Sequence, residues 1–475
     1  MGSVDIPLDR VLASTGGQVV RTGAQRFSAA TIDGRAVPAG ALFFAVKGDR
    51  FDGHDFAGQA VAAGATGVVV ARGRAAGLDR VDSATVIEVD DPVQALGQLA
   101  HAHRLAMTDL RVVAITGSVG KTTTKEMTAS ILAASAGEAS VLKTEGNLNN
   151  HLGVPLTLLR LTGAHRFAVV EMGMSALGEI AYLTGLAEPD VAAVVSVAPV
   201  HLETLGSVEN VARAKGEIWQ GLRRNGFAVL AVDDPRIAPH AAGVPAERRF
   251  TFGPRALGAT VGYEDVKADA QGITLRLHLT GLTSRTGAVA RVGLVGAHNA
   301  SNAAAAAAIA LALDVGEGSI LEGLATVKPA KHRAQLVPVG DRTVLDDCYN
   351  AGPQSMRAAL DALVATTPVG RKKVAVLGDM LELGTDTNQL HAEVGAYAAE
   401  RADEVIAFGP LSYHLAEAAA TRLGSDHVVH VETPDAAARR VLDVSGPGDV
   451  ILVKASRGMK LERVIDLLAD ALKGR

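Results

Sequence analysis

Short apolar runs alternate with stretches of helical periodicity along most of the chain, and this alternation constrains the fold more than any other feature. In the middle of the sequence the apolar runs lie at 111–116, 167–171, 191–197 and 226–232. Parallel strands that are buried on both faces read as continuous apolar runs, and helices connect one such strand to the next. The order therefore predicts an α/β protein with a mainly parallel, doubly wound sheet.

The same alternation occurs towards both ends of the sequence. Near the beginning, strands are expected at 41–46 and 66–70, with a helix at 56–63 between them. Near the end, four further runs are each followed by a helical stretch, at 374–377, 404–408, 428–431 and 450–453. These runs indicate a second doubly wound unit of ordinary domain size.

Two segments between these regions have a different pattern. Residues 256–295 contain short alternating pieces, which predict antiparallel strands. Asn302 is expected to cap an alanine-rich helix at 303–313, and the charged segment 327–335 is interpreted as a linker.

The length of the chain sets the expected number of domains. At roughly 150 residues per domain, a chain of 475 residues predicts about three domains. We expect them at 1–105, 106–327 and 328–475, all of the α/β type, with the smallest at the N-terminus.

Composition and charge exclude several classes of protein. Lys and Arg number 46 and Asp and Glu 51, and the resulting net charge of −5 argues against a nucleic-acid or membrane-surface protein. The single cysteine, Cys348, excludes an intrachain disulfide and a Cys₂His₂ zinc site, and favours a reducing compartment. The first residues do not resemble a signal peptide, and the run 303–313 is too short to cross a bilayer. We therefore expect a cytoplasmic protein with no nucleic-acid partner and no membrane insertion.

A glycine-containing loop follows the expected strand at 111–116 and precedes a helix. Its sequence is GSVGKTT, from Gly117 through Ser118, Gly120, Lys121 and Thr122 to Thr123. Glycines allow backbone N–H groups to turn towards a phosphate, the lysine adds mobile positive charge, and the next hydroxyl can bind Mg²⁺. The longer G-x-x-x-x-G-K-[ST] spacing is not met, because Ile115 stands at its first glycine. The loop predicts nucleotide phosphate binding, and an ordinary glycine turn with a solvated lysine is the alternative.

Three polar residues further along could support that chemistry. Glu171 ends an apolar run, and the carboxyl ends of parallel strands form the crevice where α/β sheets bind ligands. His201 follows another such run. Lys215 lies on an expected helix, where its spacing alone indicates a surface position. Each of these three residues also has an ordinary structural interpretation.

Together these motifs resemble the Mur ligase family of ATP-dependent, amide-forming enzymes. The resemblance rests on GSVGKT at 117–122, GNLNN at 146–150, Glu171, AKGEI at 214–218, HNASN at 298–302 and DDCYN at 346–350. Further matching stretches are ALFFAVKGDRFDGH at 41–54, GDMLELG at 378–384 and VKASRGM at 453–459. The motifs keep their order over nearly the whole chain.

This resemblance implies a fold and an activity. The family has an N-terminal domain for the UDP end of the substrate, a central P-loop-type ATPase domain and a C-terminal Rossmann-like domain that binds the incoming dipeptide. The last three stretches are most similar to the member that joins D-alanyl-D-alanine to UDP-N-acetylmuramoyl-tripeptide. The implied reaction uses ATP and Mg²⁺, passes through an acyl phosphate and gives a UDP-muramoyl-pentapeptide for peptidoglycan. We expect the protein to be a monomer.

The resemblance also assigns roles around the ATP. Lys121 would bridge the β- and γ-phosphates within the loop, and Thr122 would bind Mg²⁺. Metal support is implied for Glu171, His201 and Lys215, the last of which is carbamoylated in relatives. Adenine would be contacted by Asn299, the γ-phosphate by Arg333, and the ribose or metal shell by Asp347.

The remaining implied residues bind the other substrates. The UDP end would be held by Asp33, Arg35 and Lys47, and the substrate channel would be lined by Asn149 and Asn150. The dipeptide, or the end of the tripeptide, would be bound by Lys454, Ser456 and Arg457. Two positions depart from the family pattern, because Gly34 replaces the serine of Asp-Ser-Arg and Gly352 replaces an asparagine.

Other functions remain open at this stage. A sibling ligase that adds one amino acid, or a folylpolyglutamate-synthetase-like enzyme, would share the ATPase core. A nucleotide-hydrolysing switch would turn over ATP without either peptide, and a scaffold would not turn it over. The sequence does not specify whether the third residue of the tripeptide is lysine or diaminopimelate.

Overall fold

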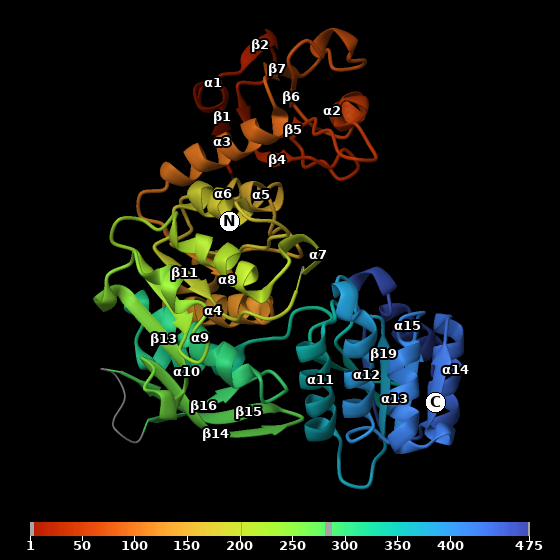
Figure 1. Ribbon diagram of the computed structural model, residues 1–475. Coiled ribbons are helices and arrows are strands. Elements are labelled where there is room, and N and C mark those ends of the chain that lie inside the picture. Colours follow the sequence, from red (N-terminus) through yellow and green to blue (C-terminus); the bar gives the residue numbers. More distant parts are fainter. Residues whose placement is uncertain (1–3, 201, 281–286, 474–475) are drawn as a thin grey trace. The chain divides into compact units, whose positions relative to one another are not determined.

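The computed structural model describes residues 4–200, 202–280 and 287–473 (Figure 1). The chain forms two compact units. The first contains the residues up to Thr116 together with Ala136–Ala193 and Gly216–Ala228. The second contains Gly117–Ser135, Val194–Lys215 and the chain from Val229 onward. Each unit is described below by itself.

The first unit begins with a five-stranded sheet in the order β2-β7-β6-β5-β4. Its strands are β2 (Gln18–Arg21), β4 (Ala29–Thr31), β5 (Ala41–Phe44), β6 (Gly67–Ala71) and β7 (Thr85–Val89). Strands β4 to β7 are parallel, and β2 pairs antiparallel with β7. The helices are α1 (Leu8–Thr15), α2 (Ala57–Ala62) and α3 (Pro92–Leu105), and β1 (Ile6–Pro7) pairs with β3 (Arg26–Phe27).

The same unit contains strands in the order β11-β8-β10-β9. They are β8 (Arg111–Thr116), β9 (Val141–Lys143), β10 (Phe167–Glu171) and β11 (Val191–Val194), with α5 (Gly153–Leu158) and α6 (Glu179–Ala187). Strand β10 is parallel to both β8 and β9. Strands β8, β10 and β11 lie where the apolar runs predict them, whereas the short strand β9 was not predicted, and the pairing of β10 with β8 confirms the parallel direction.

The second unit includes strands of mixed direction and the alanine-rich helix. The strands are β12 (Phe227–Ala231), β13 (Arg249–Pro254), β14 (Val261–Asp269), β15 (Gly272–Leu279) and β16 (Ala288–Val292). The helices are α4 (Lys121–Ala136), α7 (Leu202–Leu205), α8 (Val208–Gly216), α9 (Asn299–Ala312) and α10 (Glu317–Thr326). Strands β14, β15 and β16 are antiparallel as predicted, whereas β13 and β14 are parallel.

The end of the chain forms a six-stranded sheet in the order β17-β18-β22-β19-β20-β21. Its strands are β17 (Gln335–Val339), β18 (Arg342–Asp346), β19 (Lys373–Gly378), β20 (Glu404–Phe408), β21 (Val428–Val431) and β22 (Val450–Lys454). All are parallel except β17. The helices are α11 (Pro353–Thr366), α12 (Thr387–Ala398), α13 (Tyr413–Leu423), α14 (Pro434–Val444) and α15 (Glu462–Ala471).

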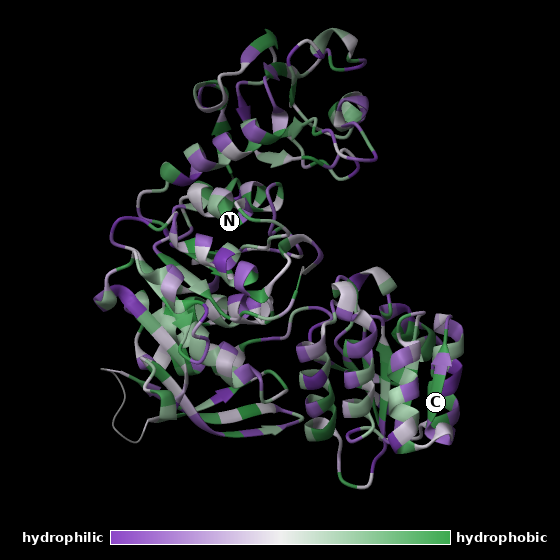
Figure 2. Ribbon diagram, viewed as in Figure 1, coloured by the Kyte–Doolittle hydropathy of each residue, from purple (hydrophilic) through white to green (hydrophobic). Residues whose placement is uncertain are grey.

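Alternating side chains of this sheet fill two separate cores. In β22, Val450 and Leu452 pack with α11, α12 and α13, whereas Ile451 and Val453 pack with α14 and α15. Successive side chains of a strand point to opposite faces, so helices on both faces leave the strand apolar throughout. In Figure 2 the inner strands are largely hydrophobic, whereas the helices carry many hydrophilic residues. The arrangement confirms the α/β fold class and the doubly wound C-terminal sheet.

No helix in the part of the chain that the structure describes is long and apolar enough to cross a membrane.

Candidate nucleotide and substrate site

Two glycines give the loop after β8 its shape. Gly120 has a φ of 85°, and a Cβ atom there would lie 2.4 Å from Oδ1 of Asn302. A Cβ atom on Gly117 would lie 2.5 Å from Cγ2 of Val195. L-residues with a side chain rarely adopt this φ, and neither neighbour leaves space for one. The loop therefore requires glycine at both positions for steric reasons.

The loop is hydrogen-bonded to the segment that follows β11. The Ser118 N–H donates to the Ser196 carbonyl (3.0 Å), and the Val119 N–H donates to the Ser196 hydroxyl (2.8 Å). In return, the Ala198 N–H donates to the Ser118 hydroxyl (2.9 Å). Ser196 was not predicted from the sequence, although a polar residue near the end of the apolar run 191–197 is the signal that could have identified it.

Lys121 is the first residue of α4, so its side chain lies at the positive end of that helix. Its Nζ donates to the Gly117 carbonyl at 2.6 Å and lies 3.4 Å from the Ser118 carbonyl. The ammonium group is therefore folded over the loop, and it can exchange these carbonyl oxygens for phosphate oxygens.

A cavity of about 440 Å³ opens beside the loop. It is lined by residues 118–123 and 197–200, by Arg236 and Arg333, and by residues 350–355. Nη2 of Arg333 lies 3.5 Å from the Thr122 hydroxyl, and its Cζ lies 4.0 Å from the centre of the Tyr349 ring. Arg333 therefore lies beside the phosphate loop, and its contact with the γ-phosphate stays a prediction. Tyr349, which was missed, orients the guanidinium group by stacking.

Asp347 is held by two donors. Its Oδ1 accepts from the Ala334 N–H (3.1 Å), and its Oδ2 accepts from Nζ of Lys454 (2.6 Å). Lys454 is buried and also donates to the Asn350 carbonyl (3.0 Å). In this structure Lys454 therefore balances the charge of Asp347, and its contact with a dipeptide stays a prediction.

The two residues after Lys454 that were predicted to bind substrate have structural partners. The Ser456 hydroxyl accepts from the Leu381 N–H (2.9 Å), and Arg457 pairs with Glu462 (3.0 Å).

The start of the alanine-rich helix differs from the prediction. Helix α9 begins at Asn299, so Asn302 lies within its first turn and is not the cap. The Asn299 side chain is buried and donates to the Val295 carbonyl (2.7 Å), while it accepts from Nδ2 of Asn302 (2.9 Å). The Asn302 Oδ1 in turn accepts from the Thr124 hydroxyl (3.4 Å). Asn302 therefore links α9 to the first turn of α4, a contact that its interpretation as a cap did not predict.

Lys215 is buried, with 2% of its surface exposed, although helical spacing alone indicates a surface position. Burial lowers the pKa of Lys215 well below its ordinary value, and the positive charge of Lys121 lowers it further. Burial therefore favours the unprotonated, nucleophilic form of the Lys215 amine.

Glu171 ends β10, where it pairs in register with Ile115 of β8. The carboxylate is 3% exposed, and its Oε1 accepts from Nδ2 of Asn149 (2.9 Å). Its Oε2 is buried and has no hydrogen-bond partner among the residues that the structure describes. A buried carboxylate oxygen without a donor is costly, and an added cation would compensate it. The Asn150 side chain instead accepts from the Leu152 and Gly153 N–H groups at the start of α5.

The residues predicted to hold the UDP end lie in the first unit. Arg35 donates to Asp33 through Nε (2.9 Å) and Nη2 (2.8 Å), and these bonds lower the pKa of Asp33 to about 2. Lys47 is exposed and forms an isolated β-bridge with Asp52. His201 lies outside the described residues.

A strand, a glycine loop and a helix N-terminus, with a lysine over the loop, define a P-loop-type nucleotide-binding protein. Comparison with known families narrows this class. Residues 26–104 match the model "Mur ligase family, catalytic domain", residues 115–310 match "Mur ligase middle domain", and residues 332–457 match "Mur ligase, glutamate ligase domain". The chain belongs to the Mur ligase family.

Individual relatives agree with this assignment. The UDP-N-acetylmuramoyl-tripeptide--D-alanyl-D-alanine ligase of Escherichia coli (strain K12) is 38% identical over 93% of this chain and 94% of its own. MurF from Acinetobacter baumannii has a similar structure, with 32% identity, a TM-score of 0.86 and coverage of 99% of this chain and 100% of that one. MurF ligase from Thermotoga maritima, solved with ADP, has 29% identity, a TM-score of 0.77 and coverage of 94% and 98%.

Replacing Gly120 with alanine should weaken binding of a nucleoside triphosphate by about tenfold or more. The positive φ alone costs an L-residue about 1–2 kcal/mol, and the contact with Asn302 adds to this. Fluorescence titration with a nucleotide analogue measures the effect. The matched control is Gly318→Ala in α10, where a Cβ atom meets nothing within 4 Å. Equal affinities of both variants would contradict a loop shaped by Gly120.

Proposed function

We propose that this chain is the ATP-dependent, ADP-forming ligase that joins D-alanyl-D-alanine to UDP-N-acetylmuramoyl-tripeptide. The observation that carries the proposal is the gathering of Lys121, Thr122 and Arg333 beside one cavity. Family membership and the relative named for this reaction support the choice of substrates. The product is the UDP-muramoyl-pentapeptide used in peptidoglycan synthesis.

The reaction has two chemical steps. An oxygen of the terminal tripeptide carboxylate attacks the γ-phosphorus of ATP, ADP leaves, and an acyl phosphate forms. The free amine of the dipeptide then attacks the acyl carbon, phosphate leaves with the former carboxylate oxygen, and the amine loses a proton. Because the first step brings two anions together, positioning and charge neutralisation account for most of the catalysis.

The cationic residues of this chain meet that electrostatic demand. Lys121 supplies a mobile ammonium group over the loop, and the N-terminus of α4 adds its dipole. Arg333 supplies a fixed guanidinium group, stacked on Tyr349 and directed at Thr122. Asp347 and Ala334 are hydrogen-bonded, which ties the segment that carries Arg333 to β18. Asn299 is proposed to contact adenine.

The chemistry of two proposed ligands fits Mg²⁺. Oε2 of Glu171, which has no hydrogen-bond partner among the described residues, and the hydroxyl of Thr122 are each oxygen ligands of the kind that this cation prefers. Mg²⁺ supplies positive charge to phosphate oxygens when it is bound. His201 and a modified Lys215 are the further proposed ligands.

We also propose that Lys215 carries a carbamate. The unprotonated form of the amine, which burial favours, can add to CO₂, forming an N–C bond and releasing one proton, and this converts the neutral amine into an anionic metal ligand. The negative charge of the carbamate is then attracted by the positive charge of Lys121, which in the unmodified protein lowers the pKa of Lys215.

Carbon-13 bicarbonate should therefore give a carbamate signal in the NMR spectrum of the native protein. Lys215→Arg removes the reactive amine and should abolish both the signal and most of the ligase activity. Lys267→Arg, on exposed strand β14, is the matched control and should leave both unchanged. A native spectrum without the signal, recorded on active enzyme, would refute the modification.

Proposals for the other substrates follow the same assignment. The N-terminal residues Asp33, Arg35 and Lys47 bind the UDP end, and Asn149 and Asn150 line the substrate channel. Lys454, Ser456 and Arg457 serve the dipeptide end. We place the domains at 1–105, 106–327 and 328–475, and regard the enzyme as a cytoplasmic monomer.

Phosphate release from ATP should require UDP-N-acetylmuramoyl-tripeptide, D-alanyl-D-alanine and Mg²⁺ together. Mass spectrometry of the product should show the pentapeptide, and tripeptides ending in lysine or diaminopimelate will identify the preferred third residue. Chelation of Mg²⁺ should stop the release.

The same assay separates the alternatives. Release with a single amino acid in place of the dipeptide would identify a sibling ligase. Release without either peptide would identify a nucleotide-hydrolysing switch, and no release under any condition would indicate a scaffold. Each of these results contradicts the proposal.

A further inference from the structure

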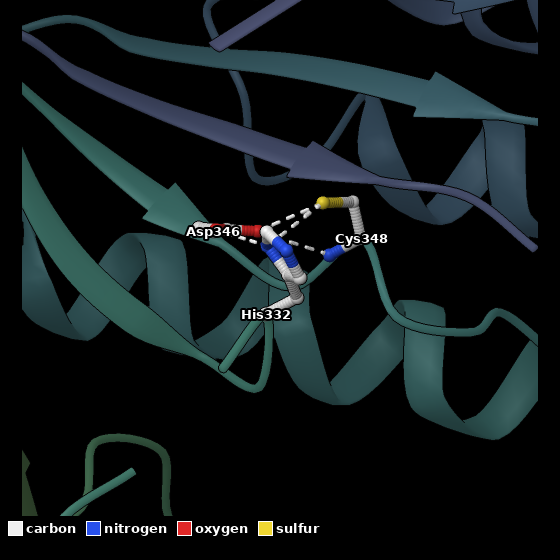
Figure 3. Close-up of side chains that lie close together, drawn as sticks. All are labelled: His332, Asp346 and Cys348. Carbon is white, nitrogen blue, oxygen red and sulfur yellow. Dashed lines mark hydrogen bonds and ion pairs between the residues drawn. The ribbon is translucent and has the colours of Figure 1, made fainter. Parts of the chain in front are cut away.

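Three side chains with metal-binding atoms converge beside the loop that carries Asp347. They are His332, which precedes β17, Asp346 at the end of β18, and Cys348 just beyond it. Figure 3 shows the three side chains directed at one another. Their ligand atoms all lie within 4.8 Å of each other.

The contacts within the cluster are short. Nδ1 of His332 lies 2.7 Å from Oδ2 of Asp346, and the Cys348 thiol donates to Oδ1 of the same carboxylate at 2.9 Å. Sγ of Cys348 and Nδ1 of His332 are 3.7 Å apart. One nitrogen, one sulfur and one carboxylate therefore surround a common point.

The cluster is also withdrawn from water. Cys348 is fully buried, and the side chains of Asp346 and His332 are 7% and 17% exposed. Burial, together with the Asp346 carboxylate, raises the pKa of the Cys348 thiol, so the metal-free protein keeps a thiol that donates a hydrogen bond. A buried carboxylate gains from a nearby cation.

The backbone holds the three residues in place. His332 has a φ of 60°, in the left-handed region, and its carbonyl accepts from the Tyr349 N–H (3.2 Å). The Cys348 N–H donates to Oδ1 of Asp346 (3.3 Å). The segments before β17 and after β18 are thus joined by a backbone hydrogen bond at the point where their side chains meet, so little ordering remains to be done on binding.

We propose that His332, Asp346 and Cys348 form a binding site for a divalent cation of the zinc class, separate from the magnesium of the ligase reaction. Metal–ligand bonds of about 2.0–2.3 Å at tetrahedral angles separate ligand atoms by about 3.4–3.6 Å. The observed separation of sulfur and nitrogen, 3.7 Å, is slightly longer than this range. The two distances to Asp346 lengthen when the hydrogen bonds are replaced by metal bonds.

The charges balance in the bound state. The thiol releases its proton, so a thiolate, a carboxylate and a neutral imidazole meet a dication, and the buried site becomes neutral. Three protein ligands leave a fourth position for water or another small ligand. Thiolate and imidazole select zinc, cobalt or cadmium over Mg²⁺, which takes oxygen ligands.

Cobalt(II) is the sharpest probe of this site, because Cys348 is the only cysteine of the chain. Titration of the full-length protein with cobalt chloride, free of added thiols, should produce a near-ultraviolet sulfur-to-cobalt absorption band that saturates at one equivalent. Equimolar zinc should abolish the band, and a large excess of Mg²⁺ should leave it unchanged. The absence of a band at saturating cobalt would overturn the proposal.

Two variants test the ligands individually. Cys348→Ser retains a hydrogen-bond donor to Asp346 and should lose the band, whereas His332→Ala should weaken cobalt binding at least tenfold. The main test does not depend on the folding of these variants. In the native protein, a band that persists with excess Mg²⁺ and disappears with zinc already identifies binding by the thiolate. Cobalt affinity of the folded His332→Ala variant equal to that of the native protein would exclude His332 from the site.

Discussion

The close packing of Gly120 against Asn302 is the constraint on which the nucleotide site depends. It fixes the phosphate loop against the first turn of α9, while Ser196 fixes the other side of the loop through backbone and hydroxyl bonds. A loop held on both sides presents its N–H groups and the start of α4 without further ordering. Preorganised dipoles of this kind stabilise transferred phosphate most strongly, because they need not rearrange during the reaction.

Several ionisable side chains of the proposed site are buried. Glu171 has an oxygen without a partner among the described residues, and Lys215 is a buried amine whose pKa is lowered well below its ordinary value. Neither arrangement favours folding, and both are compensated in the proposed enzyme by a cation and by a carbamate. Lys454 and Asp347, in contrast, neutralise each other directly. Glu171 and Lys215, whose buried polar atoms are not compensated by the described residues, are thus the residues to which the proposed chemistry assigns a metal ligand role and a modification.

The sequence predicted much of the fold because parallel strands buried on both faces leave an unmistakable apolar signal, as in β10 and β22. It also identified the family, which the comparisons confirm. It failed where a side chain acts through tertiary contacts. Asn302 was read as a cap because local spacing does not show the loop opposite it, and Ser196 and Tyr349 carry no periodic signal. The burial of Lys215 was not predicted either, because the sequence of a short helix does not show which other elements pack against each of its faces.

The central claim is that this chain activates a carboxylate as an acyl phosphate within the phosphate-loop cavity. The most direct test labels the terminal carboxylate of the UDP-linked tripeptide with oxygen-18 and analyses the phosphate released during pentapeptide synthesis. The account predicts that each phosphate carries one labelled oxygen, because the carboxylate oxygen leaves with it. Pentapeptide formed together with unlabelled phosphate would contradict the account.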